Sequence, residues 1–301
     1  MTNEAADYHA DKNSSSPSLS STVAWEIEPS NARAGSPKHG WLIHPKLGNQ
    51  PKKQTDEMRF GSICHSMLLG KGSKYQVAPI FRTAKGEISE GWKSAEAKDW
   101  KSDIEAMGII PITRQEESEA QECVVQWAKQ INDFGLGYLL KGQQYEKYLS
   151  WKEESFPEPL IERRPPIECR AMLDILTEDW REIWDIKTMP RAHPRKVISK
   201  IMDEGLPLRS EFYKRAVERI KPELAGKVKH GFLFCSVESP FAVIPVYELD
   251  GRFQLVGKKQ VERAIKTWGE CLRSNKWTLF EPIRRAEMPS YAFKDEILEE
   301  E

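Results

Sequence analysis

The spacing of apolar residues along the chain follows two periods, and the alternation between them outlines the fold. Four segments repeat apolar residues every three or four positions, so we predict amphipathic helices at 59–70, 116–133, 210–220 and 261–272. Five others are rich in β-branched and aromatic residues and are predicted to be strands: 148–156, 165–176, 181–189, 232–237 and 241–248. This order predicts one α/β domain whose mixed central β-sheet is flanked by helices.

The two ends of the chain depart from this pattern. The first 24 residues are polar, with six serines between positions 14 and 21, and they lack the basic start and apolar centre of a secretory signal. We predict a disordered segment over 1–24, a folded domain over 25–294 and an acidic, frayed tail over 295–301.

The overall charge does not select a partner. The 301 residues include 45 Lys and Arg against 46 Asp and Glu, a formal charge of -1, so any nucleic-acid surface has to be local. No stretch approaches the roughly 18 uninterrupted apolar residues of a membrane helix. The five cysteines are far apart and form no C-x-x-C pair, which argues against a zinc site or an iron–sulfur cluster. Reduced thiols in a cytoplasmic protein are the simplest interpretation.

Charged residues interrupt two of the predicted strands. If these strands pair as a hairpin with a four-residue loop at 178–181, Asp174 faces Asp185 across the pair. Directly opposite residues have Cβ atoms about 5 Å apart. Because side chains alternate along a strand, Lys187 projects from the same face as Asp185, while Ile186 points into the core. Three charged groups are therefore predicted to meet at one place.

Two neighbouring carboxylates require a counter-charge, since burying them unpaired costs several kcal/mol. A divalent cation such as Mg²⁺, which prefers oxygen ligands, would supply it, and the Ile186 carbonyl could join the ligands. Lys187 could then hold a water or stabilise the charge on a phosphate under attack, which suits phosphodiester hydrolysis. The spacing alone fits a second interpretation equally well, in which the hairpin is exposed and Lys187 is the ion-pair partner of both aspartates.

The motif D-x10-D-x-K, formed by Asp174, Asp185 and Lys187, resembles the core signature of the PDDEXK nuclease superfamily, whose members share a restriction-endonuclease-like core. Other stretches are similar to its exodeoxyribonuclease VIII (RecE-type) branch and extend the resemblance from about residue 41 to residue 282. They are RFGSICHSMLLG (59–70), FRTAKGE (81–87), SDIEAMGIIPIT (102–113), HGFLFCSVESPFAVIPVYELD (230–250) and CLRSNKWTLFEP (271–282).

This resemblance implies a metal-dependent exonuclease. The implied metal ligands are His65, Asp174, Asp185 and the Ile186 carbonyl, with Lys187 as the catalytic lysine. The implied metal is Mg²⁺, although the imidazole of His65 suits Mn²⁺ better. The resemblance also implies 5'-to-3' digestion of linear double-stranded DNA, a toroidal homo-oligomer, and a single-strand annealing protein as partner in phage-type recombination. Without it, a lone histidine on a helix is more often structural than a ligand.

Residues beyond the motif are candidates for DNA contact. Many members of the branch carry Q-x-x-x-Y on the next helix, where this chain has Arg209 and Tyr213, and arginine binds phosphate well. Tyr213 fits a core aromatic residue equally well. The stretch 189–200 is interpreted as a phosphate-contacting patch or as a solvated basic loop, and its cations include Arg191, Arg195 and Lys196.

Two other functions fit the same residues. One is a structure-specific or single-strand DNA endonuclease, but relatives of that kind commonly hold an iron–sulfur cluster, which the scattered cysteines do not support. The other is a catalytically silent DNA-binding protein, which would have no reason to keep two repelling carboxylates. Glu153 or Glu154 could add an acidic group to the site, although a solvated strand edge is the simpler interpretation.

Overall fold

The computed structural model describes residues 4–50, 55–82, 86, 88, 91–154, 165–280, 282 and 286. None of the helices in these ranges combines the length and the apolar composition that crossing a bilayer requires. The acidic tail predicted over 295–301 lies outside the described residues.

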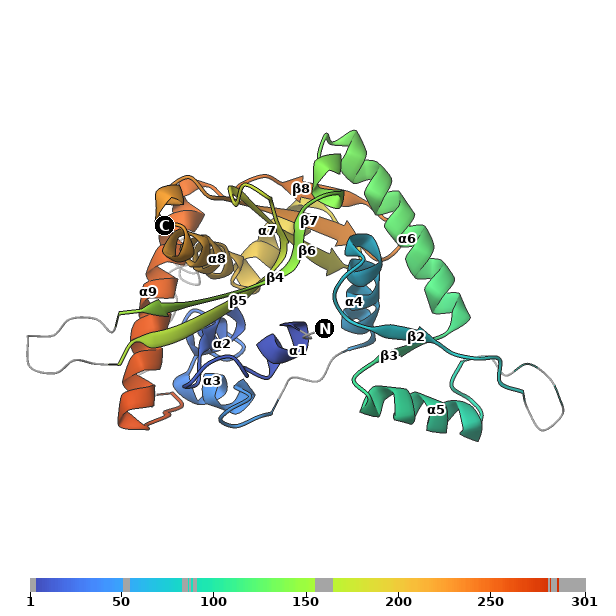
Figure 1. Cartoon of the computed structure of the whole chain (residues 1–301), viewed down its shortest axis with the longest axis horizontal. Coiled ribbons are helices and arrows are strands. Elements are labelled where there is room, and N and C mark those ends of the chain that lie inside the picture. The colour runs from blue at the N-terminus through green and yellow to red at the C-terminus, as the bar shows by residue number, and fades with distance from the viewer. Residues whose placement is uncertain are drawn as a thin grey trace, which may run out of the picture.

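A six-stranded mixed sheet forms the centre of the molecule (Figure 1). Its strands are β1 (Leu19–Ser20), β4 (Gln144–Glu153), β5 (Ile167–Leu176), β6 (Glu182–Met189), β7 (Lys229–Ser236) and β8 (Val243–Val246). β5 has β4 along one edge and both β1 and β6 along the other. The β1–β5 and β6–β7 pairs are parallel and the others antiparallel, which confirms the predicted mixed α/β sheet.

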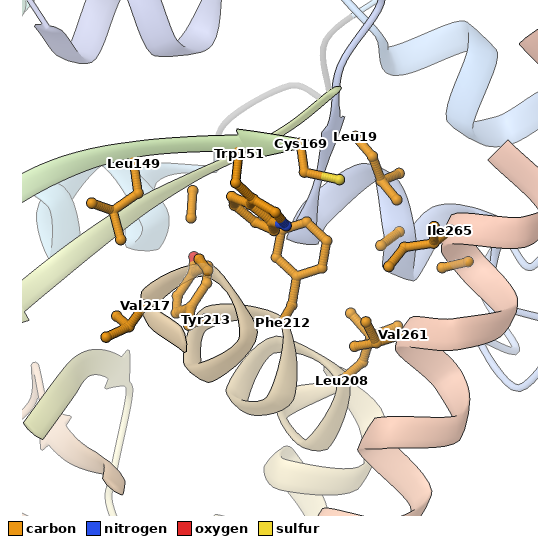
Figure 2. Packing of buried hydrophobic residues seen from close by; sticks show 14 of the residues in the cluster. Leu19, Leu149, Trp151, Cys169, Leu208, Phe212, Tyr213, Val217, Val261 and Ile265 are labelled. Atoms are coloured by element: carbon orange, nitrogen blue, oxygen red, sulfur yellow. The ribbon is translucent and has the colours of Figure 1, made fainter. Parts of the chain in front are cut away.

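One face of the sheet packs against helices near both ends of the chain. Leu176 and Ile183, which pair across the β5–β6 hairpin, project from this face into the largest apolar core. In that core the ring of Phe212 meets the ring of Trp151 edge-on, with centroids 5.0 Å apart (Figure 2). The covering helices are α2 (Ser21–Ile27), α3 (Pro37–Ile43), α8 (Leu206–Ile220) and α9 (Gly251–Ser274). The alternation of side chains along β5 and β6 thus decides which residues these helices meet.

The alternate side chains of the β5–β6 hairpin project from the opposite face of the sheet. Ile175, Trp184 and Ile186 pack there with residues of α4 (Asp56–Leu69) and α6 (Arg114–Asp133). α6 begins with a capping box, because the Thr113 hydroxyl accepts from the Glu116 amide and the Glu116 carboxylate accepts from the Thr113 amide. Figure 1 shows α4 and α6 on one side of the sheet and α8 and α9 on the other.

The prediction that residues 1–24 are disordered is wrong for residues 4–24. The segment forms α1 (Glu4–His9), β1 and the start of α2, and Leu19 is fully buried against the main core. Its serines make hydrogen bonds: the Ser20 hydroxyl caps α2 by accepting from the Val23 amide, and the Ser16 amide donates to Glu168. The serine-rich composition therefore reflects capping and pairing, which composition alone cannot separate from disorder.

Several short elements lie outside the predicted pattern. A small unit beside α4 combines a two-stranded parallel sheet with a helix and its own apolar cluster, which includes Phe81, Trp92 and Trp100. Its elements are β2 (Tyr75–Val77), α5 (Ala95–Ala106) and β3 (Ile110–Ile112). The basic stretch after β6 contains a helix, α7 (Pro194–Asp203), and two single turns of 3-10 helix occur at Gly137–Leu140 and Pro222–Leu224.

Candidate active site

The hairpin of β5 and β6 has the register that the sequence predicts. Ile175 pairs with Trp184 and Leu176 with Ile183, so the same register carried one pair further sets Asp174 opposite Asp185. The amide of Thr177 donates to the Glu182 carbonyl at 3.0 Å and closes the four-residue loop 178–181. The Asp174 carboxylate accepts from the Ile186 amide at 2.8 Å, which ties the two strands together at the level of the acids.

Asp185 and Lys187 project from the same face of β6, as predicted, and form a close ion pair. Lys187 Nζ lies 2.6 Å from Asp185 Oδ2 and also donates to the Ile186 carbonyl at 3.5 Å. The Asp185 carboxylate is only 1% exposed, and Arg209 Nη1 lies 3.9 Å from its Oδ2 atom. Burial raises the pKa of Asp185, and the charge of Asp174 adds to this, outweighing the opposing effect of Lys187.

His65 reaches the same place from α4. Its Nε2 atom lies 3.4 Å from Asp174 Oδ2. Gly61 allows this approach, because a Cβ atom there would collide with the Thr188 side chain on β6. Burial lowers the pKa of His65, but the carboxylate of Asp174 outweighs it and the net pKa is raised. The same pairing outweighs burial at Asp174 and lowers its pKa.

Glu146 on β4 is a third carboxylate at this site, and the sequence interpretation missed it. The flanking pairs Tyr145–Ile175 and Lys147–Leu173 place Glu146 at the position facing Asp174. Its Oε1 atom lies 3.5 Å from His65 Nδ1, and its backbone adopts a left-handed φ of 48°. Burial and the neighbouring charge of Asp174 raise the pKa of Glu146 to about 7.

Glu153, one of the two glutamates considered from the sequence, has a different environment, and Glu154 is exposed just after β4 ends. It is 1% exposed, and its carboxylate receives hydrogen bonds from Arg215 at 2.7 Å and Arg219 at 2.9 Å. The Trp151 indole donates to it as well, at 2.8 Å. Glu153 is therefore a fully paired buried anion, neither a site residue nor part of a solvated strand edge.

The assembled residues fit a divalent cation. His65, Glu146 and Asp174 each offer a ligand atom, and these atoms lie within 4.8 Å of one another. Two buried atoms in the cluster are held by ion pairs: His65 Nε2 lies 3.4 Å from Asp174 Oδ2, and Asp185 Oδ2 lies 2.6 Å from Lys187 Nζ. Carboxylate oxygens suit Mg²⁺, and the imidazole nitrogen suits Mn²⁺. The Ile186 carbonyl lies at the same level of β6, within reach of the Lys187 ammonium.

The two helical candidates for DNA contact have different positions. Arg209 is half-buried beside Asp185, as the ion-pair distance shows. Tyr213 is only 4% exposed and belongs to the main core, where its hydroxyl accepts from the Ser21 hydroxyl at 3.3 Å (Figure 2). The interpretation of Tyr213 as a core aromatic residue is therefore the one that the structure supports, and a DNA contact is not.

The basic residues after β6 are exposed on and beside α7. Arg195 and Lys196 lie in the first turn of this helix, where the His193 side chain accepts from the Arg195 amide. Arg191 pairs with Glu238 at 2.8 Å, and both side chains remain largely exposed. The patch thus lies on a capped helix directly following the strand that carries Asp185 and Lys187.

Comparisons with known proteins identify the fold. No protein-family model matches the chain, and no curated protein does. The solved structure of "Putative exonuclease" from Eubacterium rectale is 12% identical, with a TM-score of 0.58 over 94% of this chain and 96% of that chain. The structure of SSO0001 is also 12% identical, covers 60% of this chain and 69% of that chain, and has a TM-score of only 0.27. The first likeness shows a shared fold over nearly the whole length of both chains.

Proposed function

We propose that this chain is a metal-dependent nuclease that hydrolyses phosphodiester bonds of DNA. One observation carries the proposal: three half-buried or buried carboxylates, a histidine and a lysine converge at the β5–β6 hairpin, and the ligand atoms of His65, Glu146 and Asp174 lie within 4.8 Å of one another. A purely structural cluster would have no use for such crowding of like charges. The fold shared with a protein named as an exonuclease supports the same chemistry.

Each residue of the cluster has a task in this reaction. A bound divalent cation would offset the carboxylate charge and polarise the phosphate, and His65, Glu146, Asp174 and Asp185 would hold it. Hydrolysis adds water to phosphorus, breaks the P–O bond to the sugar and leaves a proton on the departing oxygen. Lys187, fixed by its contacts with Asp185 and the Ile186 carbonyl, donates to the phosphate oxygen on which negative charge grows.

The proposal extends to the substrate. The resemblance to exodeoxyribonuclease VIII supports digestion of linear double-stranded DNA from its ends, 5' to 3', leaving single-stranded tails for recombination. The proposed working form is a toroidal homo-oligomer around the DNA, with a single-strand annealing protein as partner. A chain with a formal charge of -1 can serve this purpose if the basic residues concentrate on the inner wall of the ring.

Three DNA substrates test this proposal. Purified protein is incubated with linear duplex, covalently closed circular duplex and single-stranded circles, with Mg²⁺ or with chelator. We expect loss of the linear duplex alone, and only with metal. Cleavage of either circle would indicate an endonuclease instead, and binding without loss of any DNA would indicate a catalytically silent protein.

A lysine variant tests the assignment of the site. Lys187→Met removes the ammonium without removing a metal ligand, so hydrolysis should fall about a hundredfold or more while calorimetric uptake of Mn²⁺ persists. Asp133→Asn, at the exposed end of α6, is a control and should behave like the wild type. Full activity of Lys187→Met would show that the hairpin is not the catalytic centre.

A further inference from the structure

A groove with a volume of about 710 Å³ opens beside the candidate metal site. It lies between the end of α4, the following loop, β2 and one face of α6. Ser66, which lines it, is the neighbour of His65. Gly72 lines it too, and a Cβ atom built there would lie 3.5 Å from both His65 Nδ1 and Glu146 Oε1. The groove and the metal site therefore share a wall.

The lining of the groove combines cations with apolar and aromatic surface. Lys71 and Lys74 are both exposed, and none of the described residues that line the groove is acidic. Lys71 donates to the Tyr145 carbonyl at 2.9 Å, which fixes it next to Glu146. Tyr75 is 36% exposed, and Val125 on the facing side of α6 is 64% exposed. Positive charge therefore alternates with surface on which a flat apolar group can lie.

We propose that this groove binds the unpaired nucleotides that adjoin the scissile phosphate. This inference rests on the proposed function, since it assigns part of the DNA substrate to the groove. A single strand presents phosphates for Lys71 and Lys74 and free base faces for Tyr75, which is the combination that single-strand binding surfaces use. In a duplex the base faces are stacked within the helix and cannot reach Tyr75. An acidic peptide would satisfy the lysines but would leave the aromatic surface without a partner.

Oligonucleotide binding measured in the presence of chelator separates the contribution of base stacking on Tyr75 from that of the lysine charges. A short labelled single-stranded oligonucleotide of mixed sequence is titrated by fluorescence anisotropy at several salt concentrations. Tyr75→Ala should weaken binding about tenfold, or ~1.4 kcal/mol, without changing the salt dependence, because it removes stacking and no charge. Lys74→Ala should reduce the slope of log K against log salt by about 0.7, the value for one phosphate contact in a single strand.

Two further variants control the experiment. Tyr75→Phe keeps the aromatic face and should retain wild-type affinity, which distinguishes stacking from a folding defect. Lys259→Ala removes an exposed lysine from α9 and should leave both affinity and slope unchanged.

The outcomes distinguish this inference from the proposed function. If Tyr75→Ala and Lys74→Ala bind single strands like the wild type while the wild type degrades DNA with Mg²⁺, the groove assignment is wrong and the nuclease remains. If both variants weaken the binding of a blunt duplex as much as the binding of a single strand, the groove does not select unpaired nucleotides. If the wild type neither binds nor degrades DNA, the proposed function itself fails.

Discussion

Strand β5 carries two clusters of charged residues, one at Arg170 and one at Asp174, four residues further along. They differ in how their charged groups are paired. Around Arg170 the charged groups pair with one another, and we call them the closed cluster. Arg170 Nη1 lies 3.2 Å from Asp11 Oδ1, and its Nε atom donates to the Tyr8 carbonyl at 3.1 Å. Asp11 also accepts from the Ser18 amide at 3.0 Å and lies 3.4 Å from His44 Nε2. This arrangement fastens the N-terminal segment to the sheet.

Around Asp174 acidic groups are crowded together, and we call these residues the open cluster. The carboxylates of Glu146 and Asp174 crowd one another beside His65, Asp185 adds a third acidic group nearby, and Glu146 has a left-handed backbone. Aspartate, such as Asp11 with its φ of 53°, adopts this conformation far more readily than glutamate does. The comparison teaches that burial of charge does not by itself mark a functional site. What distinguishes the Asp174 cluster is that its carboxylates and histidine offer ligand atoms within 4.8 Å of one another.

The largest expected effect is at the open cluster. Asp185→Asn should lower DNA hydrolysis about a thousandfold, because under the proposed function it removes a carboxylate ligand of the cation. In chelator it should not lower the free energy of unfolding, since the raised pKa of Asp185 means that the folded protein disfavours its ionised form. Activity assays and urea unfolding of the same preparation measure both quantities. Lower stability of Asp185→Asn in chelator would show that the open cluster is structural after all.

The closed cluster should respond in the opposite way. Asp11→Ala leaves the Arg170 guanidinium buried without its carboxylate, so the free energy of unfolding should fall by about 3 kcal/mol. Specific activity per folded molecule should stay close to that of the wild type. Urea unfolding followed by tryptophan fluorescence measures the loss. An unchanged midpoint would mean that the N-terminal segment contributes little to the fold.

The difference between the clusters also explains what the sequence could predict of the site. The hairpin register was predictable because it depends on local alternation and loop length around Asp174 and Asp185. His65 required a family resemblance, since its approach depends on Gly61 packing against β6. Glu146 could not be found at all, because its position follows from the pairing of β4 with β5 across a long connection and from a backbone conformation that no residue pattern indicates.

Prediction of the fold from the sequence has the same limit, because it succeeds where local pattern decides and fails where tertiary contacts decide. Helix α6 and the second half of α9 were predicted because one apolar stripe decides their burial, whereas the first ten residues of α9 (251–260) were not predicted as helix. The N-terminal segment was misjudged because its order depends on tertiary partners, namely Arg170 for Asp11 and Glu168 for Ser16. Helix α7 was not predicted as a helix, since its exposed basic residues outweigh a narrow apolar stripe formed by Val197 and Ile201.

His230 is a useful contrast to both clusters, because it is a buried residue without hydrogen-bond partners among the described residues and belongs to neither cluster. Both ring nitrogens are without hydrogen bonds among the described residues, and the ring lies 4.5 Å from Phe232 and 5.8 Å from Tyr213 between centroids. Burial, followed by the charges of Lys187 and Lys214, lowers the pKa of His230 to about 3, and Arg209 acts in the same direction against Asp174. An unpaired buried atom is therefore not sufficient to indicate a ligand site.

This depressed pKa has a definite sign for stability. Below pH 6.5 the unfolded chain binds a proton at His230 that the folded chain excludes, so stability is lost as the pH falls from 6.5 towards 3. Between pH 7 and pH 5 the loss from this residue should be about 2 kcal/mol. Urea unfolding should show a flatter pH dependence for His230→Phe than for the wild type. Parallel profiles would mean that the folded protein admits the proton.

The smallest expected effect isolates the backbone of Glu146. Glu146→Gly and Glu146→Ala both remove the carboxylate, so both should lose metal uptake to the same degree. They differ in backbone freedom, because glycine adopts a φ of 48° without strain and alanine does not. The glycine variant should therefore be the more stable by about 1 kcal/mol, the reverse of the usual order within a strand. If alanine is the more stable in urea unfolding, Glu146 is not held in the left-handed conformation, and the open cluster loses the strained backbone that sets it apart.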